Sequence, residues 1–178
     1  MNRVMKIAAF LVTFSVGAIG ITQGRMPAGT KTVTVNIKRV DGKTVGTAVL
    51  SEVDHGVKIM LDIKSLPPGP HFIHIHQHPL CQAPDFQSAG PHFDPMGGMN
   101  HGDHGAAGMP AGDIPNFVLN VNADGTARTS VVAPNVTLGA DTNSVLSNGG
   151  TSIVIHAVAD KVTAAAPPRI ACGVIERL

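Results

Sequence analysis

The chain has 178 residues, which suits one domain preceded by a targeting segment. Its formal net charge of +1 gives no basis for a nucleic-acid partner, and six Phe with neither Trp nor Tyr leave few rings for stacking on bases or sugars. Histidine is the conspicuous residue type, because seven of the nine histidines lie between His71 and His104.

The first twenty residues have the layout of a secretory signal peptide. Arg3 and Lys6 precede an apolar run over 7–19, and Ala18-Ile19-Gly20 supplies a small-x-small end. The run is too short for a comfortable membrane span, although an uncleaved anchor is the alternative. We therefore expect a signal peptide over 1–20, a protein exported to the periplasm or the extracellular space, and no stable membrane association after cleavage.

The mature chain is expected to be nearly neutral and entirely β. Cleavage after Gly20 leaves 11 basic against 12 acidic residues, and 21–31 is expected to be a flexible lead-in to a single domain over 32–178. Short alternating or apolar runs, with turn signals at Asp41-Gly42 and Asp124-Gly125, predict strands and an all-β sandwich or barrel. The predicted strands are 32–38, 47–53, 57–63, 72–76, 117–121, 127–132, 152–158 and 170–175.

A long loop rich in Gly, Met and His is predicted between the fourth and fifth strands, over 79–114. Such a loop buries little apolar surface, so a metal ion or a disulfide is the expected means of fixing it. Cys81 and Cys172 are the only cysteines, and an even pair in an exported chain suggests a disulfide. Two buried free thiols would be the alternative in a cytosolic protein.

Three histidines stand on predicted strands. Because side chains alternate along a strand, His74 and His76 point to one face while the isoleucines beside them point to the core. Imidazole suits copper, zinc, iron and nickel, but an H-x-H pair alone is a weak signal. His156 lies in an apolar strand and must be paired or liganded if it is buried; taken alone, it fits a satisfied core histidine better.

Five segments in order resemble the Cu,Zn superoxide dismutase family. They are GPHFIHIHQH (69–78), SAGPHFDP (88–95), GDIPN (112–116), IVIHAVAD (153–160) and RIACGVI (169–175). The resemblance implies an eight-stranded Greek-key β-barrel with a long metal-binding loop, and a superoxide dismutase acting on the superoxide anion.

The resemblance also implies roles for individual residues. His74, His76 and His156 match copper ligands, His92 matches the imidazolate that bridges copper and zinc, and Arg169 matches the residue that guides superoxide to copper. Four further assignments follow in the same way. His71 matches a structural histidine, Asp160 a carboxylate linking ligands of the two metals, Cys81–Cys172 a disulfide tying the loop to the last strand, and His55 and His78 are surface histidines without a ligand role.

The zinc side departs from the family pattern. His92 and Asp113 match directly, and His101 fits a second histidine ligand with a one-residue shift. Pro110 stands where the third histidine is expected, and His104 could replace it because neighbouring glycines make the loop pliable. A structural zinc site needs four ligands.

Methionines in the same loop allow one more interpretation. Thioether sulfur is a soft Cu(I) ligand, but Met more often fills gaps beneath a loop, which is the interpretation we favour for Met96, Met99 and Met109.

Two function classes remain at the level of sequence. One is a copper-dependent superoxide dismutase with copper and zinc as cofactors, and the other is a non-catalytic copper- or zinc-binding module on the same fold. All four copper-ligand positions and Arg169 are filled, which favours the enzyme. The sequence leaves open whether the protein forms a homodimer.

Overall fold

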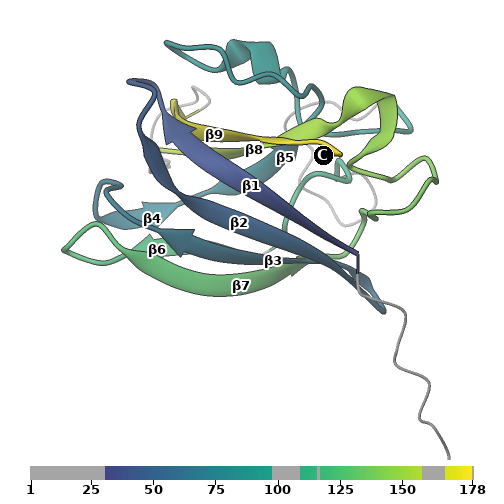
Figure 1. Cartoon of the computed structure of the whole chain (residues 1–178), viewed down its shortest axis with the longest axis horizontal. Coiled ribbons are helices and arrows are strands. Elements are labelled where there is room, and N and C mark those ends of the chain that lie inside the picture. The colour runs from purple at the N-terminus through teal and green to yellow at the C-terminus, as the bar shows by residue number, and fades with distance from the viewer. Residues whose placement is uncertain (1–30, 98–108, 116, 158–166, 178) are drawn as a thin grey trace, which may run out of the picture.

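The computed structural model describes residues 31–97, 109–115, 117–157 and 167–177 (Figure 1). The predicted signal peptide lies outside this part of the chain, as do His101, His104, Met99 and Asp160. Within the described residues, no helix has the length and apolar character needed to cross a bilayer.

The described chain is built almost entirely of strands, as expected. The strands are β1 Thr32–Arg39, β2 Thr44–Val53, β3 Gly56–Ile63, β4 Gly69–His71, β5 Ile73–His76, β6 Leu119–Val121, β7 Ala127–Ala133, β8 Thr151–His156 and β9 Arg169–Ile175. Two short 3-10 turns, η1 Gln87–Ala89 and η2 Ser147–Gly149, were not predicted. The predicted fourth strand, 72–76, corresponds to β5, and a short additional strand, β4, precedes it and begins in the Pro-rich stretch over 66–70.

The strands form a curled antiparallel sheet that makes half of a barrel (Figure 1). Seven strands pair in the order β5-β8-β9-β1-β2-β3-β7, and β4 pairs with β6 in a second, two-stranded sheet. The turns at Gly42 and Gly125 both have positive φ, 79° and 81°, which explains the Asp-Gly signal at each. The all-β barrel prediction is confirmed; β4 accounts for the one strand more than the eight expected.

The core lies on the concave side of the sheet and follows the alternation in the sequence. On β3, Val57, Ile59 and Leu61 are fully buried while Lys58 and Met60 are exposed. Each fully buried aliphatic side chain of this kind stabilises the fold by about 1.5–3 kcal/mol.

Strand β8 is the exception, because every residue from Thr151 to His156 is buried. One face of β8 packs into the core through Ile153 and Ile155. The other face carries Val154, which packs instead with Phe86 and Ala89 of the loop between β5 and β6 and with Cys172 of β9. This second, outer cluster places that loop against the strands that carry the histidines.

Candidate metal centre

Strand pairing places three histidines at one end of the sheet. His74 and His76 lie on the outer face of β5, because Ile73 and Ile75, which alternate with them, are buried in the core. β5 pairs with β8 in the register Ile73↔Ile155 and His76↔Ser152. The pairing of β8 with β9 shifts register between Ile155 and His156, a β-bulge of the kind that re-aims side chains next to functional sites.

Two loop segments add His92 and Asp113 to the same place. Phe93 donates its N–H to the Ile75 carbonyl at 2.8 Å, which holds His92 opposite His76. On the other side, Ile75 donates to the Gly112 carbonyl at 2.9 Å, and Asp113 lies opposite His74. Gly112 permits this approach, because a Cβ there would come within 2.1 Å of the Ile75 carbonyl oxygen.

The four histidines His74, His76, His92 and His156 converge on one point. Each offers a ligand nitrogen, and these atoms all lie within 4.8 Å of one another. The ring centroids of His74 and His92 are 4.1 Å apart, and those of His76 and His156 are 5.4 Å apart. Since a ligand nitrogen lies about 2 Å from a bound first-row metal, shifts of a few tenths of an ångström would complete the coordination of one ion.

The orientation of the rings fits a metal bound at their centre. In three of the rings, Nδ1 faces away from the centre of the cluster and lies within hydrogen-bond distance of an oxygen. His76 Nδ1 is 3.0 Å from the Gly90 carbonyl oxygen, His156 Nδ1 is 3.3 Å from that of Pro167, and His92 Nδ1 is 2.5 Å from Asp113 Oδ1. Metal-ligating histidines donate their second N–H in this way, which leaves Nε2 for the ion. His74 differs, because its buried Nδ1 has no hydrogen-bond partner among the described residues. A bound ion would satisfy that nitrogen.

Burial keeps the strand histidines neutral. Loss of solvent, reinforced by repulsion from His92, lowers the pKa of His74 to about 2. Burial likewise lowers the pKa of His76 to about 2 and that of His156 to about 4. Neutral imidazole is the form that binds a metal, so the site is ready to coordinate without first losing protons.

His71 is buried but lies outside the cluster. Its Nδ1 is 2.9 Å from the His156 carbonyl oxygen and its Nε2 is 2.8 Å from that of Pro67. The ring therefore connects the chain before β4 to the backbone of a cluster histidine. His55 and His78, which were expected to be surface histidines, are exposed.

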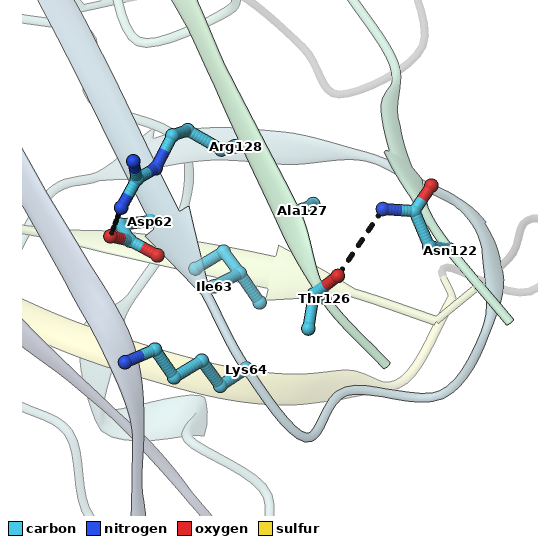
Figure 2. A pocket seen from close by; sticks show the side chains of 7 residues that line it. All are labelled: Asp62, Ile63, Lys64, Asn122, Thr126, Ala127 and Arg128. Carbon is cyan, nitrogen blue, oxygen red and sulfur yellow. Dashed lines mark hydrogen bonds and ion pairs between the residues drawn. The ribbon is translucent and has the colours of Figure 1, made fainter. Parts of the chain in front are cut away.

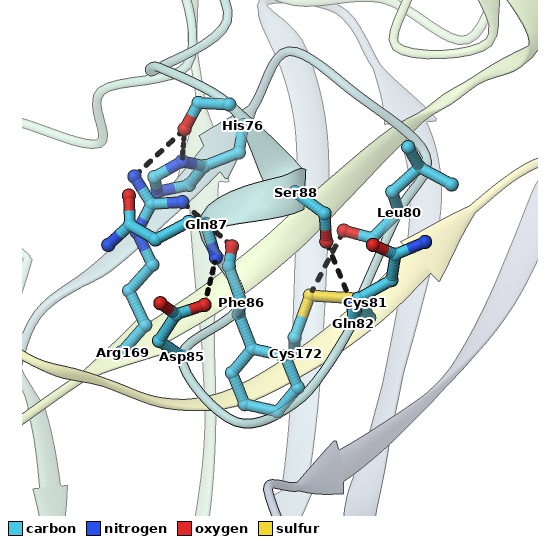
Figure 3. The surroundings of a disulfide bond; sticks show 11 residues. His76, Leu80, Cys81, Gln82, Asp85, Phe86, Gln87, Ser88, Arg169 and Cys172 are labelled. Carbon is cyan, nitrogen blue, oxygen red and sulfur yellow. Dashed lines mark hydrogen bonds between the residues drawn. A yellow bond between two sulfur atoms is a disulfide. The ribbon is translucent and has the colours of Figure 1, made fainter.

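Arg169 lies beside the cluster, held by carbonyl groups of the loop (Figure 3). Its Nη1 donates to the Phe86 carbonyl at 2.9 Å and its Nη2 to the Gly90 carbonyl at 2.8 Å, and Gly90 also accepts from His76. Burial lowers the pKa of Arg169 from its ordinary value, while the Asp85 carboxylate opposes that shift. The sequence patterns had not indicated Phe86 or Gly90 as partners, because backbone carbonyls leave no side-chain signal.

The expected disulfide is present. Cys81 and Cys172 are bonded, with Cα atoms 5.6 Å apart and a sequence separation of 91 (Figure 3). It joins the loop that carries Phe86 and Gly90 to β9, the strand that carries Arg169.

The zinc side is described only in part. Asp113 is buried beside His92, and its N–H donates to the Pro110 carbonyl at 3.0 Å, so Pro110 supports the turn that presents the carboxylate. Met109 is half-buried. Met96 is 81 % exposed, so the expectation that it fills a gap beneath the loop is wrong.

A separate surface pocket lies near the start of β7 (Figure 2). Its lining includes the ion pair between Arg128 and Asp62, 2.5 Å apart, and the hydrogen bond from Asn122 to Thr126 at 3.2 Å. Its lining holds neither histidine nor cysteine, so it is not a second version of the metal centre.

Fold and site together define an antiparallel β-barrel with a cluster of four histidines that could hold a metal ion, beside a loop attached by a disulfide. Residues 44–175 match the family model of copper/zinc superoxide dismutase. The chain belongs to this family.

Relatives and solved structures agree. The chain is 38% identical to a "Superoxide dismutase [Cu-Zn]" of Caulobacter vibrioides, over 80% of this chain and 84% of that protein. It is 40% identical to "Superoxide dismutase [Cu-Zn] 2" of Aquifex aeolicus, over 76% of this chain and 81% of that protein. A double mutant of a SOD-like protein from Bacillus subtilis superposes with a TM-score of 0.72 at 34% identity, over 81% and 97%. The Cu/Zn superoxide dismutase of Brucella abortus superposes with a TM-score of 0.63 at 32% sequence identity, covering 82% of this chain and 100% of that chain.

Proposed function

We propose that the protein is a copper-dependent superoxide dismutase, which converts two superoxide anions and two protons into oxygen and hydrogen peroxide. The observation that carries the proposal is the convergence of His74, His76, His92 and His156 with the guanidinium of Arg169 beside them. Copper, when bound, supplies the one-electron redox couple that the reaction requires.

The residues of the chain contribute binding, orientation and a proton. Arg169 presents a fixed cationic fork to a small anion, because two loop carbonyls hold its Nη atoms. His92 has its Nδ1 on Asp113, so its Nε2 is the nitrogen that can hold a proton and donate it to the departing peroxide. His74, His76 and His156 are proposed as the other copper ligands.

Zinc is proposed as the second metal, beside His92. His92 Nδ1 and Asp113 Oδ1 lie 2.5 Å apart in a hydrogen bond, and both atoms would become available as zinc ligands once the proton between them is lost. His101 and His104, from the residues outside the described part, are proposed as the remaining ligands, since Pro110 cannot coordinate.

A second candidate is a metal-binding module without dismutase activity. It is favoured by one comparison, because the structural relative with a TM-score of 0.72 is described only as a SOD-like protein. The complete histidine cluster of this chain argues against it.

Metal analysis of the purified mature protein, combined with a dismutase assay, separates the two functions. The enzyme should contain about one copper per chain and lose activity when copper is removed by a chelator, with recovery on adding Cu(II) but not Zn(II). A chain that binds copper fully and yet leaves superoxide decay at the uncatalysed rate would be the non-catalytic module.

Export is part of the proposal. We propose that residues 1–20 are removed and that the mature protein acts in the periplasm or the extracellular space, free of the membrane. N-terminal sequencing of the mature protein should begin near Ile21, and light scattering will decide between a monomer and a homodimer.

A further inference from the structure

Phe86 combines three features that bear on how Arg169 is held. Its side chain is only 2% exposed, its backbone adopts a left-handed conformation with φ 54°, and its carbonyl accepts a hydrogen bond from Arg169. Left-handed φ is unfavourable for a bulky side chain and persists only where the surroundings impose it. The burial of the ring in the outer cluster is what can impose it here.

The ring and the carbonyl of Phe86 face different partners. The ring packs with Val154 of β8 and Cys172 of β9, beside the disulfide. The carbonyl accepts the Ala89 N–H at 3.1 Å and Arg169 Nη1 at 2.9 Å. Figure 3 shows the ring directed toward the disulfide and the carbonyl toward the guanidinium. One residue thus connects the apolar cluster to the cationic group beside the metal centre.

We propose that Phe86 is a positioning residue for Arg169: its buried ring fixes the left-handed turn that aims the Phe86 carbonyl at the guanidinium. With Gly90 alone, the guanidinium would be held through one nitrogen and could rotate about that bond. With both carbonyls, its plane is fixed. This inference rests on the proposed role of Arg169 as the anion-guiding residue.

The structural part of the proposal can be tested without metal or activity. In the metal-free protein, NMR should show slowly exchanging guanidinium protons of Arg169, because both Nη atoms donate to carbonyls. Phe86→Ala should abolish the protected Nη1 signal, and Phe86→Leu, which keeps an apolar anchor, should restore it. Phe86→Gly tolerates the left-handed turn but lacks the ring, so it should behave as Phe86→Ala does.

Val154→Ala is the matched control. Val154 is fully buried in the same cluster but has no carbonyl on Arg169, so this variant should lower stability while leaving the Arg169 signals protected. Equal loss of protection in Val154→Ala and Phe86→Ala would overturn the proposal, as would an unchanged Arg169 signal in Phe86→Ala.

The functional part is measured by anion binding to the copper-loaded protein. Azide should bind about tenfold more weakly to Phe86→Ala, the order of effect for a hydrogen bond to a charged group, and at near wild-type strength to Phe86→Leu. In an Arg169→Met background, Phe86→Ala should add no further loss. If Arg169→Met itself leaves azide binding and dismutation unchanged, the proposed role of Arg169 fails, while the NMR result still decides whether Phe86 positions it.

Discussion

The two sides of the metal centre are held by different means. His74, His76 and His156 stand on β5 and β8, where antiparallel pairing and the large core beneath fix the backbone. His92 and the carbonyls that hold Arg169 stand on the loop after β5. The part of that loop before Gly90 is held by a disulfide and a cluster of four buried residues, and its later part is held at Phe93 by the core and by a backbone hydrogen bond to Ile75 of β5.

This difference predicts that the strands determine copper binding, whereas the loop affects stability, zinc binding and anion guidance. Displacing a histidine on a strand requires breaking the sheet, so the metal-binding side should persist as long as the barrel is folded. The part of the loop that carries Phe86 and Gly90 can shift while the barrel stays intact, because it packs in the small outer cluster and not in the main core. We therefore expect changes on the strands to remove copper, and changes on the loop to alter stability, zinc binding or anion guidance.

The largest effect is expected on the strand side. His76→Ala removes one of four proposed copper nitrogens and should reduce copper affinity and activity by at least about 100-fold. Elemental analysis and a dismutase assay measure both quantities. His55→Ala, at an exposed histidine, is the control and should change neither. Wild-type copper content and turnover in His76→Ala would show that the copper assignment is wrong.

Loss of the disulfide should destabilise the protein without removing its strands. Because the bond closes a loop with a sequence separation of 91, the chain-entropy model assigns it about 4.6 kcal/mol of unfolding free energy. Cys81→Ser should show this loss in denaturant unfolding, with an unchanged far-UV spectrum. The reduced wild-type protein is the control and should match the variant. A loss below about 1 kcal/mol would mean that the outer cluster holds the loop by itself.

The metal-free protein should lose stability as the pH falls below 6.5. Burial keeps the pKa of His74 and of His76 near 2 in the folded state, while unfolded histidine titrates near 6.5. Below pH 6.5 the unfolded chain therefore takes up protons that the folded protein does not. Each of these two histidines then lowers the free energy of unfolding by up to about 1.4 kcal/mol per pH unit, most steeply well below pH 6.5. Urea unfolding between pH 6.5 and 5 measures this slope.

A variant isolates the contribution of one histidine to that slope. His74→Asn removes one titrating group and should flatten the pH dependence, whereas His55→Asn at the surface should leave it unchanged. Identical slopes in the wild type and in His74→Asn would mean that His74 is not shielded in the folded state.

On the loop side, zinc should depend on His104. His104→Ala should lower the zinc content while most copper stays bound, because three of the four proposed copper histidines are held by the strands. The exposed His78 supplies the control, His78→Ala, which should keep both metals. Unchanged zinc in His104→Ala would show that His92, His101 and Asp113 suffice with a water or another group as the fourth ligand.

The smallest effect is expected from salt. The segment 160–169 has only Lys161 and Arg169 as basic residues, and the mature chain is nearly neutral, so few charges can attract superoxide from a distance. The rate should lie below the diffusion limit and change little as salt shortens the Debye length from about 30 Å to about 8 Å. Pulse radiolysis across this range is the measurement. A near-diffusion-limited rate that falls steeply would assign steering to basic residues elsewhere, such as Lys58, Lys64 or Arg128.

Sequence reasoning was most reliable where one local pattern fixes the outcome. The alternation in β3 predicted its buried face, and the H-x-H pattern of β5 predicted two imidazoles on one face. It was less reliable between β3 and β5, where Pro-rich residues hid the short strand β4. It was wrong for Met96, because a loop with little core contact gives no local signal of what is covered.

The sequence by itself determined every strand except β4, the family and the cysteines available for a disulfide. These follow from local periodicity, from motifs in a fixed order and from the presence of a single cysteine pair. Only the tertiary structure decided how the far ring nitrogens of the histidines are satisfied and how Arg169 is held. The physical reason is that His156 meets His74 through strand pairing between distant segments, and that Phe86 and Gly90 act on Arg169 through carbonyl groups, which every residue carries.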